Sequence, residues 1–137
     1  MRLVLDTNTV VSALLWEGVP HSLLAAIRDK GVALFTSRPL IAELADVLSR
    51  RKFEKQLAAA LLSSGQLVDW YARSTTSVRP VSVPRLVSDP DDDVVIGTAV
   101  AAKADFIVTG DHALLSVVEY EGVRIVSVVE ALRIVAS

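Results

Sequence analysis

Short apolar runs alternate with longer helical segments along this chain, and this alternation limits the folds that it can adopt. Four runs consist almost entirely of apolar or β-branched residues: Arg2–Leu5, residues 32–36, Phe106–Val108 and Val123–Val126. Strands of a parallel sheet lack polar residues when helices cover both of its faces. The pattern therefore predicts an α/β fold, a three-layer α/β/α sandwich around a mostly parallel sheet.

Helical segments with recognisable start and stop signals fill the intervals between these runs. Asp6 or Thr7 is placed to cap the first helix, Gly31 to end the second, and Ser37 to cap the third. The elements expected are helices over residues 7–15, 22–30, 38–50, 53–63, 66–72, 92–103, 112–117 and 128–135, a hinge near Gly65, and an extended connection or edge strand over residues 77–86.

Length and composition allow a substantial core and exclude several classes of protein. The 137 residues are expected to form one domain, residues 1–137, and 52% of them are hydrophobic, which argues against a disordered chain. No cysteine is present, which excludes disulfides and thiolate metal sites, and two histidines do not suffice for a His-rich zinc site. A net charge of −2 argues against a protein that simply coats nucleic acid, but it is compatible with an enzyme that holds phosphates through metal ions.

No part of the sequence has the pattern of a membrane span or an export signal. No apolar run approaches the roughly 18–20 residues that a span needs. The N-terminus resembles a signal peptide only superficially, because Asp6 and Asn8 interrupt its apolar stretch and no small-residue cleavage site follows. We therefore expect a cytoplasmic protein that does not associate with membranes.

Acidic residues stand at four places where a strand ends or a helix begins, each next to strongly apolar sequence: Asp6, Glu43, the run from Asp89 to Asp93, and Asp111. Alone, each has an ordinary explanation as a helix cap, a turn residue or a rim residue that reaches water. The run, however, holds four aspartates in five positions, which is more negative charge than capping requires. Mutual repulsion should raise the pKa of some of these carboxyl groups unless a cation binds.

Together, these carboxylates are expected to converge on one edge of the sheet. Asp6 and Asp111 directly follow strands, and ligands of open α/β sheets bind outside the carboxyl ends of the strands. A bound Mg²⁺ or Mn²⁺ ion is the simplest compensating charge, since no lysine or histidine partner is evident. Such an ion can activate water and clamp a phosphodiester, while Asn8 and Thr109 orient the carboxylates or waters.

Helical phase separates the candidate ligands from their neighbours. Glu43 lies on the edge of the apolar arc of its helix, whereas Asp46 points well away from it. Asp92 lies on the face that is expected to be buried, and Asp93 lies to the side. Asp92 is therefore the preferred ligand, and the other acids of the run are expected to be caps or outer ligands: Asp89, Asp91 and Asp93.

Two further segments have both an ordinary and a functional interpretation. Arg50, Arg51, Lys52 and Lys55 form a basic cluster, which is either a solvated helix end, the more common case, or a phosphate-steering patch. The helical pair over residues 53–72 carries more apolar surface than one small sheet needs. This surface is either core or a contact face for a partner.

These motifs resemble those of the PIN domain. Three segments carry the resemblance, in the right order and over nearly the whole chain: LVLDTNTVVSALLW, LIAEL and DPDDDVVIGTAVAAKADFIVTGDHALL. They are most similar to the bacterial and archaeal branch described as toxin components of toxin–antitoxin pairs, related to VapC. The resemblance implies a Rossmann-like sheet and a metal-dependent ribonuclease that prefers single-stranded RNA.

The resemblance also implies a set of ligands and partners. It places the four acids of the family at Asp6, Glu43, Asp92 and Asp111, with Asp93 as the alternative third acid when positions are counted from the last strand. It further implies a cognate antitoxin protein and a homodimer or higher homo-oligomer. The leading hypothesis is therefore an Mg²⁺- or Mn²⁺-dependent endoribonuclease, the toxin of such a pair.

Two alternatives stand beside this hypothesis. A non-catalytic module of the same fold would bind RNA or a partner protein, and its acids would hold a structural metal or basic side chains of the partner. A phosphatase-like or receiver-type α/β domain also binds Mg²⁺ in an acidic pocket. Against the second alternative, no lysine stands at the downstream position that contacts phosphate, because Lys103 comes too early and within a helix.

Overall fold

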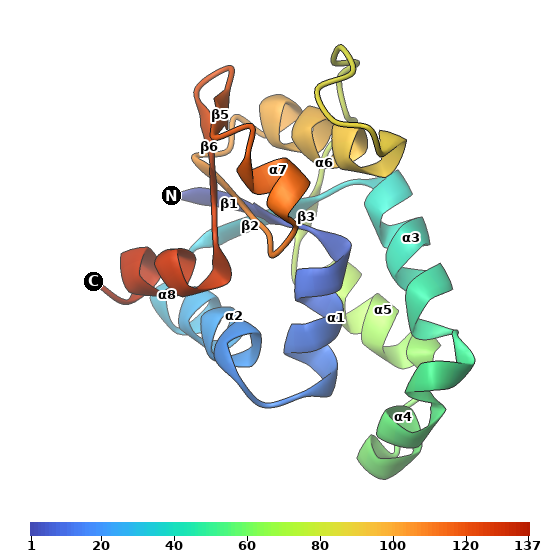
Figure 1. The fold of residues 1–137 in the computed structure, drawn as a ribbon. Helices are drawn as coiled ribbons and strands as arrows, with labels where there is room; N and C mark the ends of the chain where they lie inside the picture. Colours follow the sequence, from blue (N-terminus) through green and yellow to red (C-terminus); the bar gives the residue numbers. More distant parts are fainter.

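A central six-stranded sheet organises the computed structural model, which describes residues 1–137 (Figure 1). The strand order is β3-β2-β1-β4-β6-β5, and all neighbours are parallel except β5 and β6. The strands are β1 (Arg2–Leu5), β2 (Ala33–Thr36), β3 (Thr76–Ser77), β4 (Phe106–Val108), β5 (Glu119–Tyr120) and β6 (Val123–Val126). The predicted α/β class with a mostly parallel sheet is confirmed.

Helices connect the strands and begin or end at residues suited to those places. They are α1 (Thr7–Leu15), α2 (Val19–Lys30), α3 (Arg38–Leu48), the 3₁₀ turn η1 (Arg51–Phe53), α4 (Glu54–Ala60), α5 (Ser64–Arg73), α6 (Pro90–Ala101), α7 (His112–Leu115) and α8 (Val128–Ala136). Asp6 caps α1, since its Oδ1 accepts the Thr9 N–H at 3.0 Å. Gly31 ends α2 in the left-handed conformation, with φ 65°.

Some helix ends differ from the prediction for local reasons. α2 begins at Val19 and α6 at Pro90, both earlier than expected, because proline fits the first turn of a helix, where no intrahelical bond needs its N–H. Ser37 precedes α3 but makes no capping hydrogen bond. Its hydroxyl pairs instead with Thr98 Oγ1 at 2.9 Å, which ties the start of α3 to α6.

The segment between α4 and β4 also departs from the prediction. The hinge of the helical pair lies at residues 61–63 rather than at Gly65, because Ser63 and Gln66 form a reciprocal capping box that starts α5. The connection over residues 77–86 pairs with the sheet only at its start, in the two-residue strand β3. The antiparallel strand β5 was not predicted, because two residues carry no periodicity.

Helices cover both faces of the sheet and bury a separate core on each. In β1, Leu3 and Leu5 join the core formed with α1, α2, α3, α5 and α8, whereas Val4 joins the core formed with α6 and α7. This division follows from the alternation of side chains along a strand. Figure 1 shows α6 on one side of the sheet and α2 with α8 on the other, as the predicted three-layer arrangement requires.

The helices of the fold are short compared with a membrane span. No single helix is long and apolar enough to cross a membrane. Only α1 and α2 taken together meet those criteria, and they bend by 92° at the break between them.

The strand order changes direction at β1, and this position defines where a ligand can bind. β2 and β3 lie on one side of β1, and β4 and β6 lie on the other. Such a switch point leaves a crevice outside the carboxyl ends of the strands. Asp6 follows β1 and Thr109 follows β4, so both residues reach this crevice.

Candidate active site

The four carboxylates predicted as ligands line one cleft at the carboxyl edge of the sheet. The cleft has a volume of about 240 Å³, and its walls come from the start of α1, from α3, and from the first residues of α6 and α7. Its lining residues are mostly polar: Asp6, Thr7, Asn8, Glu43, Asp46, Val47, Arg50, Asp89, Asp91, Asp92, Val95 and Asp111. The structure therefore brings Asp6, Glu43, Asp92 and Asp111 together, with Asn8 and Asp89 beside them.

Asp6 is held in place by two hydrogen bonds and is only 6% exposed. Its Oδ1 accepts the N–H of Thr9, and its Oδ2 accepts the hydroxyl of Thr109. Thr109 is fully buried, and its Oγ1 in turn accepts the N–H of Asp111 at 2.9 Å. One hydroxyl therefore orients the Asp6 carboxylate and links it to the turn that carries Asp111.

Asp92 carries the largest electrostatic perturbation among the acids of the cleft. Burial, together with the negative charges of four neighbouring carboxylates, raises its pKa to about 7; these carboxylates are Asp111, Asp89, Asp6 and Glu43. Its Oδ2 atom is buried and has no hydrogen-bond partner. The Asp92 carboxylate thus occupies a position where negative charge is unfavourable and a cation would relieve it.

Glu43 is perturbed in the same direction on the opposite wall. Burial raises its pKa, the hydroxyl of Thr7 opposes this shift, and the nearby carboxylates of Asp91 and Asp89 raise the pKa further. Asp91 was expected only as a cap or outer ligand, but it lies close enough to Glu43 to affect its ionisation. The cleft therefore concentrates more negative charge around Glu43 than the sequence predicted.

Asp93 lies outside the cleft. Its carboxylate forms an ion pair with Arg85 at 3.0 Å and accepts the N–H of Leu86 at 3.4 Å. Asp92, in contrast, has an unpartnered oxygen and lines the cleft. This geometry favours Asp92 over Asp93 as a cation ligand, in agreement with the helical phase.

Asp46 and Arg50 also line the cleft, although the sequence reasoning did not place them there. Asp46 was expected to point well away, but it reaches the cleft and pairs with Arg50 at 3.3 Å. The helical phase describes only which side of α3 faces the core, whereas the cleft extends onto the exposed side. The four-residue spacing between these two charges was the available sign of their pairing.

The sequence matches a known family model over residues 2–113, and the family is the PIN domain. The chain belongs to the PIN domain family. No curated protein and no solved structure matches it significantly. PIN domains are generally metal-dependent nuclease modules, so membership supports a hydrolase that acts on nucleic acid.

The donors in this PIN domain suit a hard divalent cation. They are carboxylates with hydroxyl and amide neighbours, and Mg²⁺ and Mn²⁺ prefer such oxygen ligands. The unpartnered Oδ2 of Asp92 is a free ligand atom. No three acidic or histidine side chains lie close enough together to share one ion, so the fit rests on the chemistry and the charge of the donors.

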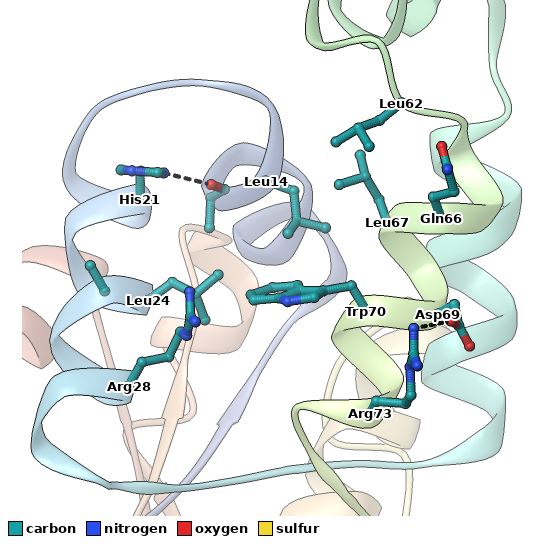
Figure 2. Close-up of a pocket in the computed structure, with 12 residues that line it drawn as sticks. Leu14, His21, Leu24, Arg28, Leu62, Gln66, Leu67, Asp69, Trp70 and Arg73 are labelled. Atoms are coloured by element: carbon teal, nitrogen blue, oxygen red, sulfur yellow. Dashed lines mark hydrogen bonds and ion pairs between the residues drawn. The ribbon is translucent and has the colours of Figure 1, made fainter.

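A second, larger hollow of the PIN domain lies between α2 and α5 (Figure 2). It has a volume of about 580 Å³ and is lined mainly by apolar side chains, among them Leu14, Leu24 and Trp70. The guanidinium of Arg28 lies 5.1 Å from the centre of the Trp70 ring. None of its lining residues belongs to the carboxylate cleft, so this hollow is a separate feature.

The helical pair predicted to carry excess apolar surface divides between core and exterior. Leu67 is buried and Val68 packs against the core, as the ordinary interpretation requires. Leu61 is 90% exposed and Leu62 is 40% exposed, and Leu62 lines the hollow next to α2. Part of the apolar surface therefore remains exposed to solvent.

Proposed function

We propose that this PIN domain is a divalent-metal-dependent endoribonuclease that cleaves phosphodiester bonds in single-stranded RNA. The observation that carries the proposal is the charge of the cleft, which is lined by seven carboxylates and one basic side chain. Like charges at such density are unfavourable in a partly buried site, and they would also repel a phosphate. Bound cations remove both obstacles.

Asp6, Glu43, Asp92 and Asp111 would hold Mg²⁺ or Mn²⁺, which when bound would supply Lewis-acid activation of water and neutralise charge on the phosphodiester. Thr109 keeps the Asp6 carboxylate oriented through its hydroxyl. Asn8 is exposed in the cleft, where its amide can donate a hydrogen bond to a phosphate oxygen of the substrate.

Replacement of Asp6 by asparagine tests the proposal. Asp6→Asn keeps an oxygen that can cap α1 but removes the charge, so the fold should persist while Mn²⁺-dependent cleavage of single-stranded RNA is largely lost. Cleavage is followed on labelled oligonucleotides with Mn²⁺ and with EDTA, and thermal unfolding checks the fold. Asp69→Asn, a change on the exposed surface of α5, serves as the control and should leave cleavage unchanged.

Retained cleavage in the Asp6 variant would refute the assignment of this site. Purified wild-type protein that degrades no single-stranded RNA with Mn²⁺, but still binds it or a protein partner, would instead support the non-catalytic alternative. These two outcomes separate an error about the residue from an error about the activity.

We further propose that the protein acts in the cytoplasm as the toxin of a toxin–antitoxin pair, with a cognate antitoxin and a second copy of the chain as partners. The mostly apolar hollow between α2 and α5 and the exposed Leu61 and Leu62 support the existence of a contact surface. The test is genetic: a neighbouring reading frame should encode a small DNA-binding protein whose co-expression relieves growth arrest. Growth that is unaffected by expression of the chain alone would contradict the toxin role.

A further inference from the structure

Arg50 is the one basic residue that lines the carboxylate cleft. It lies just beyond the end of α3, and its guanidinium is 3.3 Å from the carboxylate of Asp46. The two side chains are 53% and 73% exposed, so water screens their attraction and the pair is weak. The planar guanidinium is therefore available to a phosphate, which it can bind through two parallel hydrogen bonds.

Basic side chains continue from Arg50 away from the cleft. Arg51 and Lys52 follow in η1 and Lys55 in the first turn of α4, and all of them are exposed. The carbonyl of Arg50 accepts the N–H of Phe53 at 3.0 Å, which closes the 3₁₀ turn η1. A chain of phosphates that enters the cleft would meet these charges on one side.

An exposed aromatic side chain lies beside this segment. Trp16 follows α1, is 44% exposed, and packs edge-on against the buried ring of Phe53 with 5.8 Å between ring centres. The ammonium of Lys52 lies 5.1 Å from the centre of the same Phe53 ring. Trp16 is therefore partly open to solvent, and exposed aromatic rings stack unpaired bases in proteins that bind single strands.

We propose that Arg50, Lys52 and Trp16 form a binding track for a single-stranded RNA that leaves the carboxylate cleft. The inference rests on the proposed function, because the cleft supplies the reaction. Arg50 binds the phosphate next to the reacting one, Lys52 binds a phosphate further along, and Trp16 stacks an unpaired base. The positive charges select a polyanion, and the aromatic face selects an unpaired nucleic acid among polyanions.

Binding of a labelled RNA of about 12 nucleotides, followed by fluorescence anisotropy with Ca²⁺ over a range of salt concentrations, tests the track. Arg50→Ala should weaken binding about tenfold, because a hydrogen-bonded charge is lost. It should also reduce the slope of log affinity against log salt by about 0.7, the value for one phosphate contact. Asp46→Asn should strengthen binding, since Arg50 is then released from its competing partner.

Arg73→Ala is the matched control for Arg50→Ala. Arg73 also pairs with an aspartate four residues earlier on an exposed helix surface, at 2.6 Å from Asp69, but it lies outside the track. The control should leave both the affinity and the salt slope unchanged. Thermal unfolding of both variants confirms that the fold is intact.

The two tryptophans of the chain allow a separate test of stacking. In Trp70→Phe, the remaining Trp16 should lose fluorescence when RNA binds. In Trp16→Phe, the remaining Trp70 lies in the hollow between α2 and α5 and should not respond. Heparin serves as a polyanion without bases, and it should bind without quenching Trp16.

The possible outcomes separate the track from the nuclease. Equal affinity and salt slope for Arg50→Ala and Arg73→Ala, with RNA bound by the wild type, would overturn the track and leave the nuclease proposal in place. RNA binding without cleavage in Mn²⁺ would overturn the nuclease proposal, while the RNA affinities of the same variants would still test the binding track. Absence of RNA binding by the wild type would overturn both, and absence of Trp16 quenching would overturn the stacking role.

Discussion

Thr109 is uncharged, yet it connects the two acidic positions that follow β1 and β4. Its hydroxyl donates to Asp6 and accepts the N–H of Asp111 inside the protein. Residues that orient metal ligands through hydrogen bonds commonly affect metal affinity almost as much as the ligands do. A substitution of Thr109 therefore tests whether the orientation of Asp6 matters for metal binding, without removing a carboxylate from the cleft.

Thr109→Val keeps the shape of the side chain but removes the hydroxyl. We expect Mn²⁺ affinity to fall about 10- to 100-fold, because Asp6 loses its orientation. The unfolding free energy should fall by about 1–3 kcal/mol, since the buried Asp6 carboxylate and the N–H of Asp111 lose their partner. Titration calorimetry and urea unfolding measure these effects. Thr76→Val on the exposed edge strand is the control, and an unchanged Mn²⁺ affinity in Thr109→Val would contradict the orienting role.

Asp92 links the charge of the cleft to the pH dependence of stability. Its pKa is raised from the ordinary value of 3.8 to about 7, so the folded protein binds a proton more tightly than the unfolded chain does. The protonated Asp92 carboxyl contributes its full stabilisation below the pKa of the unfolded chain, 3.8. This contribution is lost as the pH rises through the pKa of the folded protein, about 7. The ionised form therefore destabilises the metal-free fold above neutral pH.

Asp92→Asn removes this titration. We expect the variant to melt at a higher temperature than the wild type at about pH 8 without metal, and at a similar temperature near pH 4. Asp93→Asn is the contrasting variant, because it breaks the ion pair with Arg85 and should not stabilise the protein. Melting curves in EDTA across this pH range provide the measurement. Stabilisation by Asp93→Asn instead would reverse the roles assigned to the two residues.

At the scale of single residues, the sequence was most informative where one helix decides the outcome. The phase of α6 separated Asp92 from Asp93, and the position of Asp6 and Asp111 directly after parallel strands placed both at one edge of the sheet. Asp46 was misplaced, because its position depends on a cleft wall built by several elements. Whether the carboxylates bind a cation stays a prediction.

At the scale of elements, α6 depends on one glycine. A Cβ atom at Gly97 would lie 2.3 Å from the carbonyl oxygen of Val81, and the N–H of Val81 donates to the carbonyl of Gly97 at 3.2 Å. The connection before α6 therefore rests directly on the backbone of the helix. The same helix carries Asp92 into the cleft, so its position matters to the site.

Gly97→Ala should push α6 away from this connection. We expect a loss of about 1–3 kcal/mol in unfolding free energy, as for other overpacked sites, together with weaker Mn²⁺ binding because Asp92 moves with the helix. Gly65→Ala in α5 is the matched control. A Cβ there would meet its nearest atom at 3.9 Å, so the change should be neutral or stabilising by up to about 1 kcal/mol. Equal stability of the two variants in urea would contradict the close packing described at Gly97.

Elements with strong local sequence signals were predictable, whereas elements that exist only through pairing with another strand were not. The apolar runs, Gly31 and Asp6 gave most strands and helix ends, because their conformations depend on a few adjacent residues. β3 and β5 have two residues each and exist only through pairing with β2 and β6. The capping box at Ser63 places the start of α5 before Gly65, the expected hinge. Two reciprocal hydrogen bonds stabilise this helix start more than the flexibility of one glycine disfavours it.

For the whole molecule, alternation of strands and helices predicted the layers but not the order of the strands. The order β3-β2-β1-β4-β6-β5 comes from contacts between distant segments. The convergence of the acids was nevertheless predictable, because parallel strands share one carboxyl edge whatever their order.

Exposed apolar residues lead to a prediction about assembly. Leu61, at 90% exposure, and Leu62 lie beside the hollow between α2 and α5, so we expect a dimer or a higher oligomer in solution. Gel filtration with light scattering at high micromolar concentration measures the mass. Leu61→Glu with Leu62→Glu should favour the monomer, whereas Val129→Glu on α8, at an apolar position elsewhere that is 56% exposed, should not. A monomeric wild type at that concentration would contradict the prediction.

The bond between Asp6 and Thr109 joins residues 103 positions apart, and it exists only when β4 has docked against β1. During translation, Asp6 leaves the ribosome first, and its hydrogen-bond partner Thr109 follows 103 residues later. A nascent chain therefore has no complete cleft until Asp111 has emerged and β4 has joined the sheet. Under the proposed ribonuclease activity, an unfinished chain would therefore not cleave the transcript that encodes it.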